Sequence, residues 1–332
     1  MYIKEDTLDD LLRRVLARLL KSNRTIGPTR GKATELTGVL LQLSNPRARL
    51  SRTERKQHFF SSLGELLWYL AGANDLDFIT HYVERYESES EDGLTVYGAY
   101  GPRLFSMRGR LNQVDNVCRL LKRSAFSRRA VIQLFDAEDI AEPRVEAPCT
   151  CTLQFLCRDN RLHMFTSMRS NDAYFGLAHD VFAFTMLQEI IARSLALEVG
   201  SYKHAIGSLH LYEVHRASAQ QYLDEGVQAR IAMPPMPTGD PWRSIGVVLA
   251  AEQSIRGGGQ VKSGDLELDP YWADLVRMLQ VYYLYRSGKS TGIATLKAEM
   301  ASRDYDIYIE QKNRPPKTRR PSDRPRQLPL FR

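Results

Sequence analysis

The sequence is poor in cysteine and contains no long apolar run. Its four cysteines, in a chain of 332 residues, are too few for a disulfide-stabilised scaffold. No run of about 18 apolar residues occurs that would span a membrane. The N-terminus carries acids in place of the apolar stretch of a signal peptide. We therefore expect a protein of the reducing cytoplasm that has no membrane partner.

The net charge of +7 is spread unevenly along the chain. Lys, Arg and Pro are concentrated in residues 312–326, and such a composition buries too little apolar surface to order itself. We expect a folded domain over residues 1–300, followed by a basic, proline-rich and flexible tail over residues 301–332. Contact of this tail with nucleic acid or another partner is the alternative to a solvated tail.

Apolar periodicity separates helices from strands along the chain. It predicts helices over residues 8–19, 59–71, 180–195 and 272–285, and strands over residues 130–135, 153–157, 162–165 and 205–212. Residues 158–161 are typical of a hairpin turn, and residues 25–38 have the composition of a loop. Long helices combined with strands joined by tight turns favour the α+β class.

Cys149 is a candidate nucleophile. It follows Pro148 at the start of a strand, and Arg169 lies twenty residues further on. A reactive thiolate needs cationic surroundings, which Arg169 or the pair Arg128 and Arg129 would provide. An inert core cysteine is the alternative. A metal site with Cys151 lacks a second closely spaced Cys or His pair, so no metal site is predicted.

Five side chains are further candidates for a binding or catalytic site. Arg169 and Ser170 suit a phosphate, because the guanidinium binds bidentately and the hydroxyl adds a donor. Glu65 is an acid in an apolar helix, which indicates either a function or a buried salt bridge. His210 and Tyr212 are two apart in a strand and share one face, although core packing also explains a tyrosine there.

At these residues the chain resembles the thymidylate synthase family. The resemblance is co-linear over residues 8–290 and densest over residues 147–215. It is carried by Glu65-Leu66-Leu67-Trp68, Val96-Tyr97-Gly98, Ser127-Arg128-Arg129, Pro148-Cys149 with Gln154-Phe155, Arg169-Ser170 with Asp172, Gly176, and His210 with Tyr212.

The resemblance implies a fold, a reaction and a set of roles. The fold is a mixed, twisted β-sheet packed by long helices, with one sheet face forming a homodimer interface. Residues 1–300 form the catalytic domain, the substrate is a pyrimidine nucleoside monophosphate, and the cofactor is 5,10-methylenetetrahydrofolate. The roles are catalysis by Cys149, Glu65 and Tyr97; phosphate binding by Arg169, Ser170, Arg30 and, across a dimer, Arg128 and Arg129; sugar binding by His210 and Tyr212; and folate binding by Asp172 and Gly176.

The departures from the family's pattern favour a particular branch. The chain has Thr150 where thymidylate synthases have His, Asp180 where they have the Asn that reads the base, and Ser208 where they have Asp. Together with Asn171, these departures resemble the deoxycytidylate and cytidylate hydroxymethylases. The segment Tyr82–Tyr86 lacks the family's Trp, and the C-terminus does not match the synthase ending. We therefore expect a site that is more accessible to water than that of a thymidylate synthase.

Asp180 carries the prediction about the base. Cytosine presents an amine and an unprotonated ring nitrogen, so an ionised carboxylate accepts from the amine and favours protonation of the nitrogen. The sequence therefore predicts a C5-hydroxymethyltransferase acting on CMP or dCMP. The alternatives are thymidylate synthesis from dUMP and a nucleotide- or RNA-binding protein without catalysis.

Overall fold

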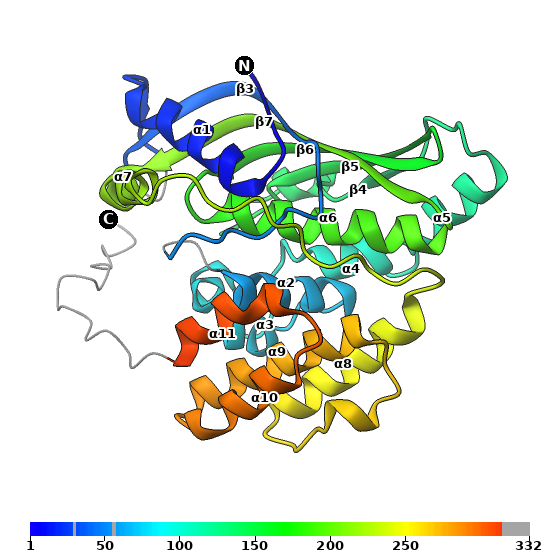
Figure 1. The fold of residues 1–332 in the computed structure, drawn as a ribbon. Coiled ribbons are helices and arrows are strands. Elements are labelled where there is room, and N and C mark those ends of the chain that lie inside the picture. Colours follow the sequence, from blue (N-terminus) through cyan, green and yellow to red (C-terminus); the bar gives the residue numbers. More distant parts are fainter. Residues whose placement is uncertain (29–30, 55–57, 314–332) are drawn as a thin grey trace.

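The computed structural model describes residues 1–28, 31–54 and 58–313. These residues form a seven-stranded mixed sheet in the order β1-β3-β7-β6-β5-β4, with β2 paired to β3 (Figure 1). The β1–β3 and β6–β7 pairs are parallel, and the others are antiparallel. The strands are β1 (Tyr2–Glu5), β2 (Thr25–Ile26), β3 (Ala33–Leu43), β4 (Val131–Gln133), β5 (Thr150–Arg158), β6 (Arg161–Asp172) and β7 (Glu198–Tyr212). The expected α+β class is confirmed.

Helices α1 and α6 pack against the strands, α7 lies beside α1, and α8 to α11 form a further layer together with α2 and α3 (Figure 1). Helix α6 connects the parallel strands β6 and β7 and fills the core with its apolar side chains. The helices are α1 (Leu8–Lys21), α2 (Phe59–Leu70), α3 (Leu76–Tyr82), α4 (Tyr100–Phe105), α5 (Gln113–Arg123), α6 (Gly176–Ser194), α7 (Arg216–Asp224), α8 (Trp242–Arg256), α9 (Pro270–Arg286), α10 (Ile293–Glu299) and α11 (Asp306–Asn313).

Local sequence signals explain where several elements begin and turn. The hydroxyl of Thr7 accepts a hydrogen bond from the Asp10 backbone N–H (3.1 Å) and so caps α1. Asp159 and Asn160 have φ of 51° and 56°, the left-handed backbone that a two-residue hairpin between β5 and β6 requires. The predicted helices over residues 8–19, 59–71, 180–195 and 272–285 and the predicted hairpin are confirmed.

Two expectations about chain organisation are wrong. Residues 25–38, predicted to be a loop, contain β2 and the start of β3, because pairing with β7 overrides the local turn composition. The folded domain does not end at residue 300 either. Tyr305, Tyr308 and Ile309 are buried in the core, so the packed part of the chain includes α11. The rest of the expected tail, residues 314–332, lies outside the described residues.

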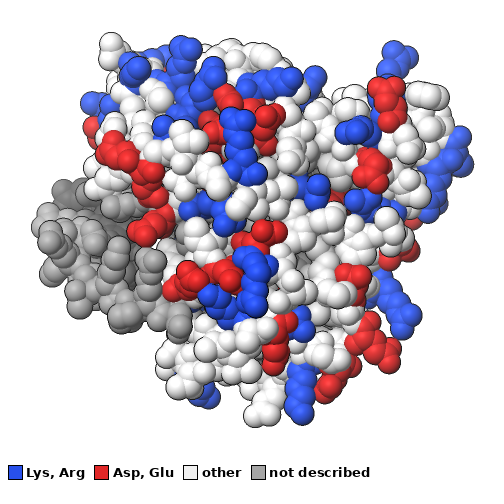
Figure 2. Space-filling model, in the orientation of Figure 1, with Lys and Arg blue, Asp and Glu red and all other residues white. Residues whose placement is uncertain are grey.

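The sheet face opposite α6 is less buried. Leu40, Leu156, Phe165 and Ala205 are only partly buried there, and register places Leu40 beside Ala205. This is the face on which a homodimer interface is predicted. On the face drawn in Figure 2, Lys and Arg are interspersed with Asp and Glu among the described residues. None of the helices described here is both long and apolar enough to span a membrane.

Candidate active site

A cleft of about 1140 Å³ opens at the carboxyl ends of the parallel strands β6 and β7, beside the N-terminus of α6. Ligand sites favour such positions in sheets with parallel strands. The cleft is lined by most of the predicted site residues, namely Glu65, Cys149, Arg169, Ser170, Asp172, Gly176, Asp180, His210 and Tyr212. Residues spread over about 150 positions of the chain are thus brought to one cavity.

Cys149 lies directly before β5 and faces the cleft. The next residue, Thr150, is fully buried, and its backbone N–H and hydroxyl both donate to the Tyr100 hydroxyl (3.1 and 2.9 Å). This anchor fixes the start of the strand. Burial raises the pKa of the Cys149 thiol to about 12, although the Arg169 guanidinium opposes the shift. The thiol is therefore protonated in the ligand-free protein at neutral pH.

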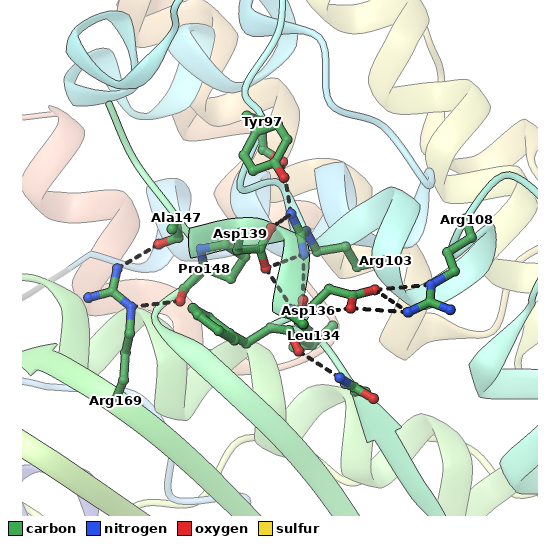
Figure 3. Close-up of polar contacts among 12 residues, drawn as sticks. Tyr97, Arg103, Arg108, Leu134, Asp136, Asp139, Ala147, Pro148 and Arg169 are labelled. Carbon is green, nitrogen blue, oxygen red and sulfur yellow. Dashed lines mark hydrogen bonds and ion pairs between the residues drawn. The ribbon is translucent and has the colours of Figure 1, made fainter. Parts of the chain in front are cut away.

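Arg169 holds the segment that presents Cys149. Its guanidinium donates to the carbonyl oxygens of Pro148 (Nε, 2.9 Å) and Ala147 (NH2, 2.7 Å) (Figure 3). It also lies 3.4 Å from the Glu146 carboxylate. The side chain is exposed to the cleft. Arg169 thus combines the cation predicted for a phosphate with a structural role next to Cys149.

Glu65 is the centre of a buried hydrogen-bond network. One carboxylate oxygen contacts His179 Nδ1 (2.7 Å), and the other accepts from the hydroxyls of Tyr69 (3.0 Å) and Tyr86 (2.5 Å). The second ring nitrogen of His179 lies 3.2 Å from the Ser61 hydroxyl. Burial alone would raise the pKa of Glu65, but the hydrogen bond and charge of His179 and the tyrosine hydroxyls hold it below its usual value. Glu65 is therefore ionised.

Asp180 lies on the first turns of α6 and accepts a hydrogen bond from the Asn171 amide (Oδ2, 2.8 Å). Burial, reinforced by the Glu65 charge, raises the pKa of Asp180 to about 8. The expectation of an ionised carboxylate is therefore wrong for the ligand-free protein at neutral pH. Asp180 keeps its proton because burial and the Glu65 charge outweigh the hydrogen bond from Asn171 and the more distant Arg85 charge.

The remaining predicted residues line the cleft near the ends of β6 and β7. The rings of His210 and Tyr212 have centroids 4.9 Å apart, as expected for two residues on one strand face. His210 Nδ1 lies 3.5 Å from the Ser170 hydroxyl. The Asp172 carboxylate accepts from the Tyr174 backbone N–H (2.8 Å). The Ser170 hydroxyl, the Asp172 carboxylate and the His210 imidazole are thus contributed by residues that line the cavity beside Arg169.

Three predicted residues do not line the cleft of this chain. Tyr97 does not line it; its ring lies 4.2 Å from the Arg144 guanidinium, and its carbonyl oxygen accepts from Arg103 (3.4 Å) (Figure 3). Tyr100 faces the cleft instead, because a helical turn starts there. Arg128 and Arg129 are exposed outside the cleft. Arg30 lies outside the described residues.

His179, Tyr86 and Tyr100 are among the cleft residues that were not predicted from the sequence. The signal for His179 was present, since it forms a polar pair with Asp180 at the start of a largely apolar helix. Tyr86 lies in the segment noted for its lack of Trp. Its bond to Glu65 joins residues 21 positions apart, which no local pattern reveals.

No group of three or more His, Cys, Asp or Glu side chains is arranged to hold a metal ion within the described ranges. Cys149 and Cys151 are both free thiols. Cys149 lines the cleft, and Cys151 does not.

The fold is that of a known enzyme class. The solved structure of thymidylate synthase from T4 phage matches with a TM-score of 0.57 and 18% identity, over 65% of this chain and 81% of that one. The sequence model of the thymidylate synthase family matches residues 8–237. This chain therefore belongs to the thymidylate synthase family. The match ends before α8, so it is shorter than the resemblance expected over residues 8–290.

Three proteins of known name are similar to this chain in sequence. The deoxyuridylate hydroxymethyltransferase of Pseudomonas phage M6 is 36% identical over 166 residues, covering 48% of this chain and 46% of that protein. That of Delftia phage PhiW-14 is 28% identical over 197 residues (55% and 54%). The thymidylate synthase of Buchnera aphidicola subsp. Baizongia pistaciae is 29% identical over 176 residues (52% and 66%). The chain spans about half the length of the two phage proteins.

Proposed function

We propose that this protein transfers a hydroxymethyl group to carbon 5 of a pyrimidine nucleoside monophosphate, with 5,10-methylenetetrahydrofolate as the one-carbon donor. The observation that carries the proposal is the convergence of Cys149, Arg169, the Glu65–His179 pair and Asp180 on one cleft. Membership of the thymidylate synthase family supports the reaction type. The phage relatives named as hydroxymethyltransferases support the product.

The first half of the reaction follows from the nucleophile and the phosphate grip. Arg169 and Ser170 hold the phosphate, and His210 and Tyr212 hold the sugar, so carbon 6 of the base lies over Cys149. The Cys149 thiol, whose ionisation is favoured by the Arg169 charge, gives its proton to water, and the sulfur then adds to carbon 6 and makes carbon 5 nucleophilic. The methylenetetrahydrofolate supplies an electrophilic one-carbon unit for carbon 5, with Asp172 and Gly176 as its proposed contacts. The cleft of about 1140 Å³ has room for both molecules.

The second half of the reaction needs an activated water. Once the carbon-5 proton has passed to water and tetrahydrofolate has left the one-carbon unit, the base carries an exocyclic methylene. A water oxygen adds to that carbon, its proton passes to ionised Glu65, and carbon 5 and carbon 6 regain their double bond as the Cys149 sulfur leaves. The hydroxyl of Tyr86 and the imidazole of His179 make a polar wall around Glu65. Such polar surroundings favour the addition of water, whereas hydride transfer favours a site from which water is excluded.

A cytosine nucleotide is the proposed base, through Asp180. A neutral carboxyl group donates its proton to the ring nitrogen as the adduct forms and accepts from the exocyclic amine through its other oxygen. The pKa of about 8 supports this neutral form. dUMP is the second candidate, because the phage relatives are named deoxyuridylate hydroxymethyltransferases and a neutral carboxyl group also pairs with uracil.

His179 is expected to keep Glu65 ionised and in position. His179→Ala should lower kcat by on the order of 10²-fold with little change in KM, since it leaves the phosphate grip intact. The pKa of Glu65 should rise without its partner, so the acidic limb of the pH–rate profile should move to higher pH. His179→Gln, which can still donate to Glu65, should recover part of the rate. An unchanged acidic limb in His179→Ala would contradict this role.

The proposed homodimer shares its active sites through Arg128 and Arg129. Mixing Arg128→Ala subunits with Cys149→Ala subunits should restore activity, because half of the random dimers contain one intact site. The expected recovery is about a quarter of wild-type activity, measured after subunit exchange has been verified by mass-tagged chains. No recovery in exchanged dimers would mean that each subunit completes its own site.

The proposed function is tested by tritium release from carbon 5. CMP, dCMP and dUMP labelled there are each incubated with the protein and methylenetetrahydrofolate, and the product is identified by mass. Release with a hydroxymethyl product supports the proposal, and the nucleotide that reacts identifies both base and sugar. Release from dUMP with a methyl product would replace it with thymidylate synthesis. No release from any of the three would remove the enzyme assignment.

A further inference from the structure

A second cavity lies at the opposite end of the sheet from the active site. Its volume is about 360 Å³, and it is formed by residues 44–47, the start of β6, the end of α6, the start of β7 and Pro235. Arg161, in its wall, is the first residue of β6, eight positions before Arg169. Eight residues of extended chain span about 26 Å, so the two cavities are separate.

The lining of this cavity is strongly basic. Three arginines, Arg47, Arg161 and Arg193, line it, with Glu198 as the only carboxylate-bearing residue in the lining. Arg193 donates to Glu198 (3.1 Å), which neutralises one positive charge. Two positive charges in the lining are therefore not balanced within it.

Two buried polar atoms in the lining also lack a partner among the described residues. Arg193 is 8% exposed, and its Nε has no acceptor. The Ser44 hydroxyl is likewise buried without a hydrogen bond. A cation at the C-terminus of α6 is favourable by itself, but this explains neither an Nε without an acceptor nor the two further arginines.

The wall of the cavity is held in shape by the chain around it. Arg47 and Met233 exchange two hydrogen bonds, from Met233 N–H to the Arg47 carbonyl (2.8 Å) and from the Arg47 guanidinium to the Met233 carbonyl (3.3 Å). Pro46 and Pro235 flank them. These contacts hold Arg47 in place in the cavity wall, which lowers the entropic cost of ordering its side chain around a ligand.

We propose that this cavity is a second anion site, which binds a phosphate group through Arg47, Arg161 and Arg193. Guanidinium groups pair bidentately with phosphate oxygens, and the volume suits a small phosphorylated molecule. The concave shape favours such a molecule over a nucleic-acid backbone. The group can be inorganic phosphate, pyrophosphate or the phosphate of a nucleotide.

The test is a calorimetric titration of the full chain carrying Arg169→Ala, which weakens the first phosphate site. Pyrophosphate should bind this protein at one saturable site, and adding Arg161→Ala should raise its Kd at least tenfold. Arg161 is exposed, so its loss should not disturb folding. Arg158→Ala is the matched control, because Arg158 is paired with Arg161 across the hairpin but does not line the cavity.

Each outcome of the titration decides the proposal. Equal weakening by Arg158→Ala and Arg161→Ala would reduce the effect to general surface charge and overturn it, as would no saturable binding with Arg169→Ala. Tighter binding of CMP or dUMP than of pyrophosphate would identify a nucleotide as the occupant. Equal or weaker binding would identify a free phosphate. Because no turnover is measured, failure here is distinguishable from failure of the proposed reaction.

Discussion

Cys149→Ala is expected to abolish turnover while the protein still binds nucleotide. Without the sulfur no bond forms to carbon 6, so carbon 5 never becomes a nucleophile. The rate of carbon-5 tritium release should fall by on the order of 10⁴-fold or more, the scale on which loss of a covalent nucleophile is felt. Nucleotide affinity, measured by calorimetry, should stay within about threefold, because the phosphate grip at Arg169 does not use the thiol.

The control for this substitution is Cys151→Ala. Cys151 is two residues further along the chain, also carries a free thiol, and does not line the cleft. Its removal should leave turnover within about twofold of wild type, because substitutions away from functional or structurally critical features usually have small effects. Measurable product from Cys149→Ala at more than trace level would rule out the covalent mechanism, and equal losses in both variants would point to a general effect on the strand.

Asp180→Asn is expected to shift the preference from cytosine to uracil nucleotides. The amide donates to a carbonyl and accepts from a ring N–H, which matches uracil, and its N–H₂ opposes the cytosine amine. The ratio of kcat/KM for the cytosine nucleotide to that for dUMP should fall by about 10²-fold or more, since hydrogen-bonding sites reject mismatched edges strongly. The measurement is the same tritium release with both labelled nucleotides in competition.

The pH dependence gives this prediction a second readout. Burial, with the Glu65 charge, raises the pKa of Asp180 to about 8, so its proton is present below that pH and lost above it. Turnover of the cytosine nucleotide should therefore decline as pH rises through about 8, and this limb should be missing in Asp180→Asn. An unchanged ratio of specificity constants would mean that Asp180 does not choose the base, and dUMP would become the favoured substrate.

The sequence predicted most of the parts of the site because those parts lie in short motifs. Glu65, Cys149 and Arg169 were each recognisable from their neighbours, and all three line one cleft. Tyr97 does not line the cleft, and its predicted catalytic role stays a prediction. The motif identifies a tyrosine near the site, but the turn of chain between Tyr97 and Tyr100 decides which ring faces it.

The sequence was less able to predict charge states and the ends of the domain. The neutral state of Asp180 depends on its burial and on the charge of Glu65, 115 positions earlier. The packing of Tyr305 and Tyr308 depends on helices far from them in sequence. The protonation state of Asp180 and the packing of the two tyrosines both depend on which residues lie close together in space. The order of residues along the chain does not reveal this.

The sequence by itself determined the class of the chain, four of its helices, its hairpin, and Cys149 and Arg169 as candidate site residues, because periodicity and motif spacing are local. Only the tertiary structure decided that His179 and Tyr86 share Glu65, that Asp180 holds its proton, and that three arginines meet around a second cavity. The physical reason is the same in each case. Hydrogen bonds and burial act over a few ångströms of space, and the residues concerned are brought within that range only when the sheet and its helices pack.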